Sequence, residues 1–88
     1  MSQWWVYIIL TKKDRLYTGI STDPERRFYE HLWDRKKGAK FFRSDAPLSI
    51  IYIEKCEDYS MALKREYAIK KMPRIKKQEL INGHHSKI

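Results

Sequence analysis

The sequence contains very few of the features that build covalent cross-links or membrane spans. Cys56 is the only cysteine among the 88 residues, so no disulfide can form within the chain, and a reducing cytosol is the expected setting. The longest unbroken apolar run, Trp4–Leu10, is far shorter than the roughly 20 residues that a transmembrane helix needs. No charged segment followed by an apolar one opens the chain, as it would in a secretion signal. We therefore expect a cytoplasmic protein with no membrane partner.

Negative charge is scarce relative to positive charge. Nineteen Lys and Arg residues stand against eleven Asp and Glu residues, which gives a formal net charge of +8 and a pI near 9.7. The segment 45–63 has four acidic residues and one basic residue, and basic segments lie on both sides of it. This distribution favours a positive face that binds a phosphate-rich partner such as nucleic acid. An anionic membrane surface, ribosomal RNA, or solvated basic helices with no partner would be compatible with the same composition.

Aromatic residues are plentiful, twelve in all, and 42% of the residues are apolar. This composition predicts one folded domain over residues 1–83, followed by a polar tail, 84–88, that we expect to be disordered. Trp4, Trp5 and Trp33 are expected in the core, because large rings dominate core burial, with a stacking surface as the alternative.

Three apolar segments predict strands, and the remaining periodic segments predict helices. The strands are rich in β-branched and aromatic residues and span Trp4–Leu10, Leu16–Ser21 and Leu48–Cys56. The helices are expected over Pro24–Lys37, from Asp58 or Ser60 through Met72, and over Arg74–Ile81. The order ββαβαα, with a loop over Lys40–Pro47, describes an α+β fold in which helices flank a small three-stranded antiparallel sheet.

Capping residues define the expected helix ends. Asp23 can accept hydrogen bonds from free backbone N–H groups, and Pro24 suits the first helical position. This first helix should stop at Gly38. Pro73 should end or bend the second helix, and Asn82-Gly83 should break the third.

Whether Tyr7 and Tyr17 share a sheet face depends on the length of the hairpin loop. With the three-residue loop Lys12-Lys13-Asp14, Tyr7 lies opposite Gly19 and both tyrosines project from one face, because side chains alternate along a strand. A two-residue loop at Lys13-Asp14 would place them on opposite faces. Gly19 would leave space beside the rings for a ligand or backbone. Half-buried strand aromatics with no further role would give the same pattern.

Glu66 is unusual because it falls within an apolar stripe. Ala62, Glu66 and Ile69 lie at positions i, i+4 and i+7 of the second expected helix. A carboxylate in such a stripe is unfavourable unless it is paired or bound to a cation. One interpretation is an ion pair with Lys70, one turn further on, or with Lys64 or Arg65. The other is a ligand for a hard divalent ion such as Mg²⁺, with waters and a substrate phosphate completing its shell.

Arg27 and His31 lie four residues apart on the first expected helix and therefore share one face. Such a pair could clamp a phosphate and relay a proton, although a solvated helix face gives the same spacing. Phe28 and Leu32 share the neighbouring face and should point to the core. His84-His85 lies in the predicted tail, and no role is expected for it.

The order and spacing of these candidates resemble the GIY-YIG nuclease superfamily. Its two tyrosine motifs correspond to Trp5-Val6-Tyr7 and Tyr17-Thr18-Gly19, and its helical Arg, His and Glu correspond to Arg27, His31 and Glu66. The segments that look most like the small, stand-alone bacterial branch of that class are Leu16–Ile20, Glu25–Arg27, Gly38–Lys40 and Arg65–Lys71. The resemblance covers nearly the whole chain.

The resemblance implies a phosphodiester-cleaving site built from Tyr7, Tyr17, Arg27, His31 and Glu66. Tyr17 would act as the general base, or orient and deprotonate the attacking water, and Tyr7 would assist it through hydrogen bonding. Arg27 would bind the scissile phosphate, and His31 would position Tyr17 or move protons. Glu66 would hold one Mg²⁺ or Mn²⁺ ion, and a single carboxylate disfavours a two-metal mechanism.

Some positions depart from the motifs of the class. The first motif has Trp5-Val6 where the class name has Gly-Ile, and the second has Thr18 where an Ile is named, but both keep the tyrosine. Phe42 stands where relatives of this branch often have a small hydroxyl residue, which could alter a substrate contact. Asn82 corresponds only loosely to a polar residue of some members. An exposed Phe41-Phe42 pair could contribute to an interface.

Three functions are compatible with these observations. The first is a Mg²⁺- or Mn²⁺-dependent endonuclease acting on DNA, for instance in repair or recombination. The others are a nucleic-acid-binding module without activity and a protein-interaction domain that docks an acidic partner. Without a separate DNA-binding domain, binding of nucleic acid is expected to depend on a protein partner or on the chain's own basic residues. The candidates for these contacts are Lys40, Arg43, Lys70 and Lys71.

Overall fold

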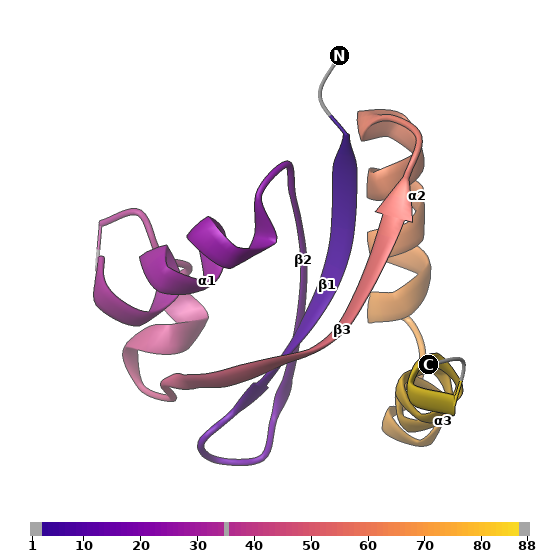
Figure 1. The fold of residues 1–88 in the computed structure, drawn as a ribbon. Coiled ribbons are helices and arrows are strands. Elements are labelled where there is room, and N and C mark those ends of the chain that lie inside the picture. The colour runs from indigo at the N-terminus through magenta and orange to yellow at the C-terminus, as the bar shows by residue number, and fades with distance from the viewer. Residues whose placement is uncertain (1–2, 35, 87–88) are drawn as a thin grey trace.

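The computed structural model describes residues 3–34 and 36–86, with side chains described through residue 83. Its strands and α-helices follow the predicted order ββαβαα (Figure 1). They are β1 (Trp4–Thr11), β2 (Leu16–Ser21), α1 (Pro24–Trp33), β3 (Pro47–Cys56), α2 (Tyr59–Lys70) and α3 (Arg74–Ser86), with a 3₁₀ turn, η1 (Lys40–Arg43), before β3. The strands form one antiparallel sheet in the order β2-β1-β3, so the predicted α+β fold is confirmed.

The hairpin between β1 and β2 has the three-residue loop. Tyr7 pairs with Gly19 and Ile9 pairs with Tyr17, so both tyrosines lie on one face of the sheet. Asp14 closes the loop with a φ of 64°, the left-handed conformation that a loop of this length requires and that Asp tolerates better than most residues. The alternative two-residue loop is therefore wrong.

The two faces of the sheet carry separate apolar clusters, and Figure 1 shows α1 and α2 on opposite sides of the strands. Val6 and Ile8 of β1 pack with Ala62 and Ile69 of α2. The side chains of β1 that point the other way, Tyr7 and Ile9, pack with Phe42 of η1. Because alternate residues of one strand supply both clusters, β1 connects the two halves of the molecule.

The start of α1 is as predicted, and its end is not. Asp23 accepts a hydrogen bond from the backbone N–H of Arg26. The helix stops at Trp33, before the predicted Lys37, and Asp34 forms its C-cap. Gly38 has no positive φ. A Cβ there would lie 2.9 Å from the Cα of His31, so Gly38 serves the close approach of the following loop to α1 instead of ending the helix.

The ends of the other helices also differ in part from the prediction. Asp58, one of the two predicted caps, accepts a hydrogen bond from Met61 N at 2.8 Å, and α2 ends at Lys70. The predicted break at Asn82-Gly83 is wrong, because α3 continues to Ser86. Gly is tolerated near a helix end at a cost of only about 1 kcal/mol. The helix enters the segment predicted as a disordered tail, and the side chains of His84 and His85 and all of residues 87–88 lie outside the described residues.

The three tryptophans do not share one environment. Trp4 is half-buried against the cluster on the α2 face, and Trp5 is also half-buried. Trp33 is 74% exposed, so its predicted place in the core is wrong. It lies two positions after the buried His31, which puts it on the opposite side of α1. Within the described residues, no helix combines the length and apolar character that crossing a bilayer would need.

Candidate active site

The hydroxyl of Tyr7 is the centre of a polar cluster on the α1 face of the sheet. Tyr7 is 1% exposed, and its Oη lies 3.1 Å from Nε2 of His31. A Cβ on Gly19, its partner across the hairpin, would lie 2.5 Å from the same Oη. The glycine therefore leaves the space that the phenol itself fills, whereas the sequence predicts space there for a ligand or backbone.

Hydrogen bonds determine the tautomer of His31. The backbone N–H of Ala39 donates to Nδ1 at 3.0 Å, so in the neutral ring the proton is on Nε2. Nε2–H therefore donates to the oxygen of Tyr7, and the Tyr7 O–H can donate elsewhere. Burial, together with the charge of Arg27, lowers the pKa of His31 to about 4, which keeps the ring neutral at physiological pH.

Arg27 lies one turn before His31 and faces the same cluster. Its Nη1 donates to Oε1 of Glu30 at 2.9 Å and to the carbonyl oxygen of Lys37 at 2.5 Å. Burial raises the pKa of Tyr7, and the charge of Arg27 and a hydrogen bond from it act in the opposite direction. The guanidinium thus lies beside the phenol, and Glu30 and Lys37, which sequence reasoning missed, hold it there.

Tyr17 lies next to these groups in a less buried position. Its ring is half-buried and packs edge-on against His31, with 5.4 Å between ring centroids. The hydrogen bond of His31 goes to Tyr7, so His31 can position Tyr17 only through this ring contact.

Phe42 holds both rings from the side of η1. It is 7% exposed, and its centroid lies 4.6 Å from that of His31 and 4.7 Å from that of Tyr17. Phe42 is therefore a supporting wall of the cluster. The prediction of an exposed Phe41-Phe42 pair is wrong, because Phe41 is half-buried beneath the guanidinium of Arg15. Their packing depends on the fold of η1, which no local pattern in the sequence indicates.

Glu66 comes from α2, beside the buried residues Ala62 and Ile69. Its side chain is 19% exposed, and one carboxylate oxygen lies 3.3 Å from Nζ of Lys70, so the ion-pair interpretation is confirmed. The charge of Glu66 also contributes to raising the pKa of Tyr7. The carboxylate therefore lies within electrostatic range of the phenol, although α1 and α2 cover opposite faces of the sheet.

The carboxylate of Glu66 fits a metal that binds together with its substrate. Among the described residues, no group of three or more His, Cys, Asp or Glu side chains is placed to hold a metal ion. Mg²⁺ commonly keeps several waters and uses only one or two carboxylates together with phosphate oxygens. One partly buried carboxylate matches that kind of site.

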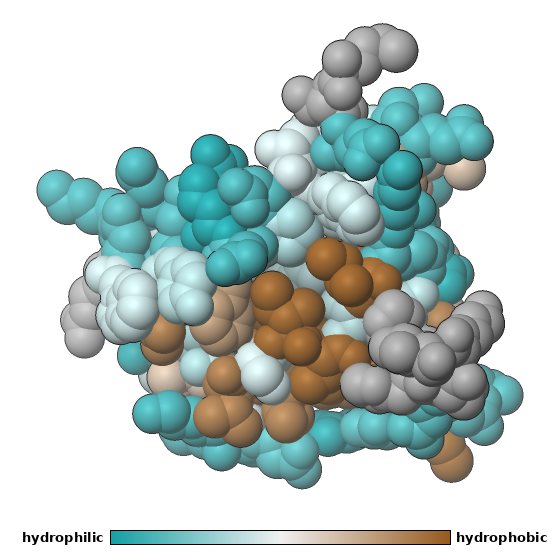
Figure 2. All heavy atoms as spheres, in the orientation of Figure 1, coloured by the Kyte–Doolittle hydropathy of each residue, from teal (hydrophilic) through white to brown (hydrophobic). Residues whose placement is uncertain are grey.

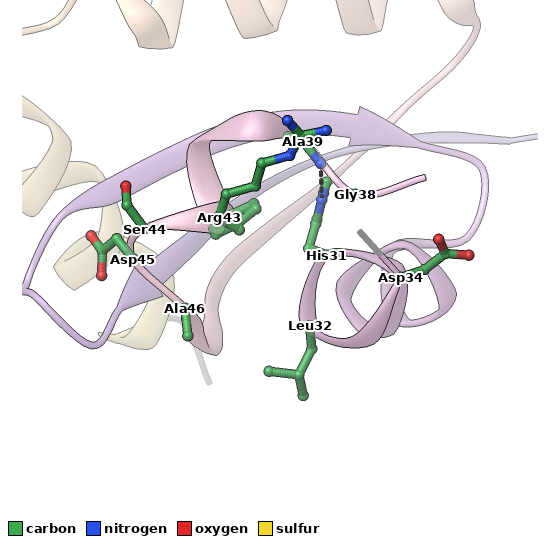
Figure 3. A pocket seen from close by; sticks show the side chains of 10 residues that line it. His31, Leu32, Asp34, Gly38, Ala39, Arg43, Ser44, Asp45 and Ala46 are labelled. Atoms are coloured by element: carbon green, nitrogen blue, oxygen red, sulfur yellow. Dashed lines mark hydrogen bonds between the residues drawn. The ribbon is translucent and has the colours of Figure 1, made fainter. Parts of the chain in front are cut away.

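The predicted nucleic-acid contacts fall into two groups. Lys40 and Arg43 are exposed on η1, where side chains three residues apart eclipse one another. Arg43 and His31 line one cavity of about 360 Å³ (Figure 3). Lys70 is paired with Glu66, and the ammonium of Lys71, the residue after α2, lies over the ring of Tyr67. The pair on η1 is therefore the more available to a phosphate.

Comparison with known proteins identifies the family of this arrangement. A sequence model described as the GIY-YIG catalytic domain matches residues 3–78. The chain belongs to the GIY-YIG family. It is 45% identical over 80 residues to a UPF0213 protein of Desulfotalea psychrophila, covering 91% of this chain and 72% of the relative. It is 38% identical over 81 residues to the UPF0213 protein YhbQ of Escherichia coli K12, covering 92% and 79%.

A solved structure confirms the fold of this GIY-YIG domain. The solution NMR structure of a UPF0213 protein from Bacillus halodurans is similar with a TM-score of 0.58 and 32% sequence identity. The match covers 91% of this chain and 83% of that one. The resemblance stated from the sequence, to the small branch of the superfamily, is therefore confirmed.

Proposed function

We propose that this GIY-YIG domain is a metal-dependent endonuclease that hydrolyses phosphodiester bonds in DNA, in the cytoplasm and in repair or recombination. The observation that carries the proposal is the convergence on the Tyr7 hydroxyl. His31 lies within hydrogen-bond distance of it, and the charges of Arg27 and of Glu66, which comes from another helix, act on its pKa in opposite directions. A phenol, a guanidinium and a carboxylate that interact electrostatically through Tyr7 are the groups that phosphodiester hydrolysis needs: a base, a phosphate ligand and a metal ligand.

Tyr17 and Tyr7 would divide the proton chemistry. Tyr7 is buried and has a raised pKa, which suits a hydrogen-bonding role more than the role of a base. Tyr17 is the less buried phenol, so it would take the proton from the attacking water. A free phenol titrates near ~10, so any phenol that acts as a base near neutral pH needs nearby positive charge.

Arg27 would bind the phosphate with the N–H donors that it does not use internally. Nη1 is occupied by Glu30 and the Lys37 carbonyl, which orients the rest of the fork. Glu66 would have to release Lys70 to hold Mg²⁺ or Mn²⁺, and the freed ammonium could then contact the substrate. When bound, the metal would supply positive charge for the phosphate and the leaving oxygen.

A second function, a nucleic-acid-binding module without activity, is favoured by one observation. Lys70 already neutralises Glu66, so the carboxylate needs no metal for its own stability. A protein partner that supplies substrate specificity is compatible with both functions. Cleavage assays therefore decide between them.

The assay uses plasmid, flap, junction and single-stranded DNA with Mg²⁺ or Mn²⁺. Cleavage should require the metal and should be lost in Tyr17→Phe, Arg27→Ala and Glu66→Ala, with unfolding curves close to that of the wild type. Each variant has a matched control of the same residue type outside the cluster, which should keep its activity: Tyr59→Phe, Arg26→Ala and Glu79→Ala. Cleavage that survives all three site changes would point to a contaminating nuclease, and metal-independent binding without cleavage would support the second function.

A further inference from the structure

Trp33 and Tyr29 form a stacked aromatic pair on the solvent side of α1. Their ring centroids lie 5.0 Å apart with an interplanar angle of 17°. Trp33 is 74% exposed and Tyr29 44% exposed, so the tyrosine supports the indole from one side and the remaining indole surface faces solvent. Large exposed aromatics of this kind commonly mark a binding surface.

Two exposed lysines follow this pair in the chain, and the backbone of one of them contacts Arg27. Lys36 and Lys37 follow three and four residues after Trp33 and are exposed, and no ion pair is found for either among the described residues. The carboxylate of Asp34 beside them accepts from their backbone N–H groups. The carbonyl of Lys37 in turn accepts from Nη1 of Arg27. Lys37 therefore lies beside Arg27, and Lys36 and Lys37 follow Trp33 closely in the chain.

We propose that Trp33, supported by Tyr29, is a stacking platform for an unpaired nucleobase of the strand whose phosphate binds at Arg27. The Arg27 part rests on the proposed function. Bases within a duplex are already stacked on both faces, so only a single-stranded, flap or unpaired nucleotide can use the indole. The cations of residues 36 and 37 would hold the phosphates between the two points.

Negative charge around the neighbouring apolar groove favours binding of the base at Trp33 over binding in that groove. A groove of about 660 Å³ lies between α1 and β3, where Figure 2 shows apolar side chains gathered. Tyr29, Leu48 and Ile53 are among its lining residues, and so are Asp23 and Glu25. Those two acidic residues disfavour a phosphate backbone there. The strand should therefore leave the platform on the cationic side.

Binding of labelled oligonucleotides without divalent metal tests the platform. Trp33→Leu keeps an apolar side chain but removes the ring, and it should weaken single-strand binding by about 5- to 150-fold. Trp33→Phe should restore most of the affinity. Binding to duplex and the slope of affinity against salt should not change, because no phosphate contact is lost. The matched control Tyr59→Leu removes another exposed aromatic, on α2, and should bind as the wild type does.

An abasic site in the strand provides the decisive comparison. The abasic site is placed at each position of the strand in turn. At one position it should weaken binding to the wild type but not binding to Trp33→Leu, and that position identifies the base that stacks on Trp33. The platform is wrong if Trp33→Leu binds single strands as tightly as the wild type, or weakens duplex equally. It is also wrong if that variant loses only self-association in sedimentation, since the surface would then contact protein. Ring-dependent binding without any cleavage would overturn the endonuclease proposal alone.

Discussion

Two clusters of the molecule use the same residue types in different ways. On the α2 face, the Tyr52 hydroxyl donates to Glu54, and Nε of Arg65 bonds both oxygens of that carboxylate at 3.1 Å. In this cluster, the carboxylate of Glu54 accepts hydrogen bonds from Tyr52 and Arg65, and the charge of Arg65 balances its own. On the α1 face, Tyr7 accepts from His31, and Glu66, whose charge acts on Tyr7 from α2, pairs with the exposed Lys70.

The comparison shows that residue type alone does not indicate a catalytic site. Burial and Glu54 raise the pKa of Tyr52 to about 12, and burial also raises the pKa of Tyr7. Both phenols are therefore perturbed. The difference is the spare bonding capacity of the α1 cluster, where Arg27 keeps donors that no described group uses. We expect substitutions in the cluster around Tyr7 to reduce cleavage, and substitutions in the cluster around Tyr52 to leave cleavage unchanged.

The largest difference is expected between two isosteric changes, Glu66→Gln and Glu54→Gln. Glu66→Gln removes a metal ligand and should lower the cleavage rate by about 10²- to 10³-fold, similar to the loss of one transition-state contact. Its unfolding free energy should change by less than about 1 kcal/mol, because the Lys70 partner is exposed. Glu54→Gln should keep the cleavage rate. Cleavage rates at saturating metal and urea unfolding curves are measured for both variants. Equal cleavage rates in Glu66→Gln and Glu54→Gln would contradict the assignment of Glu66 as the metal ligand.

Gly19→Ala tests whether the cluster around Tyr7 depends on the space that Gly19 leaves for the phenol ring. The added methyl would lie 2.5 Å from Oη of Tyr7, whose buried ring cannot move without leaving His31. We expect a loss of about 1–3 kcal/mol in the unfolding free energy, together with reduced cleavage. Gly83→Ala is the control, because its methyl meets no atom within 4 Å, and it should be neutral or slightly stabilising. Full activity in Gly19→Ala would mean that the Tyr7 position is not critical.

Some of these features could be predicted from the sequence, and others depend on contacts between distant segments. For a three-residue hairpin loop, the alternation of side chains predicts that Tyr7 and Tyr17 share one face of the sheet. Asp14, which closes that loop, is a residue type that tolerates its left-handed conformation. The end of α1 was misplaced because Gly38 acts through its approach to a helix and not through its own φ. Trp33 is exposed because it lies on the side of α1 opposite the buried His31. The tautomer of His31 depends on the N–H of Ala39, which no sequence pattern indicates.

The buried histidine makes the α1 cluster sensitive to pH. The pKa of His31 is lowered to about 4 in the folded protein, against about 6.5 for a free imidazole. The unfolded chain therefore binds the proton more readily, and stability is present above pH ~6.5 and lost as the pH falls toward 4. Linkage gives a loss of about 2 kcal/mol between pH ~7.5 and pH ~5. Urea unfolding at each pH should show this slope in the wild type and not in His31→Gln, and equal slopes would contradict a neutral buried His31.

The smallest expected effect concerns the α2 cluster itself. Arg65 and Glu54 are each about one-third exposed, with side-chain exposures of 33% and 31%, so solvent screens their attraction. Glu54→Gln should therefore lower the unfolding free energy by only about 1 kcal/mol, which corresponds to about 4–8 °C in Tm for a domain of this size. Arg65→Met should have a similar effect, and the double variant should lose less than the sum, because the two residues contact each other. A strictly additive double variant would mean that the pair contributes nothing as a pair, and that the order of the α2 cluster comes from packing alone.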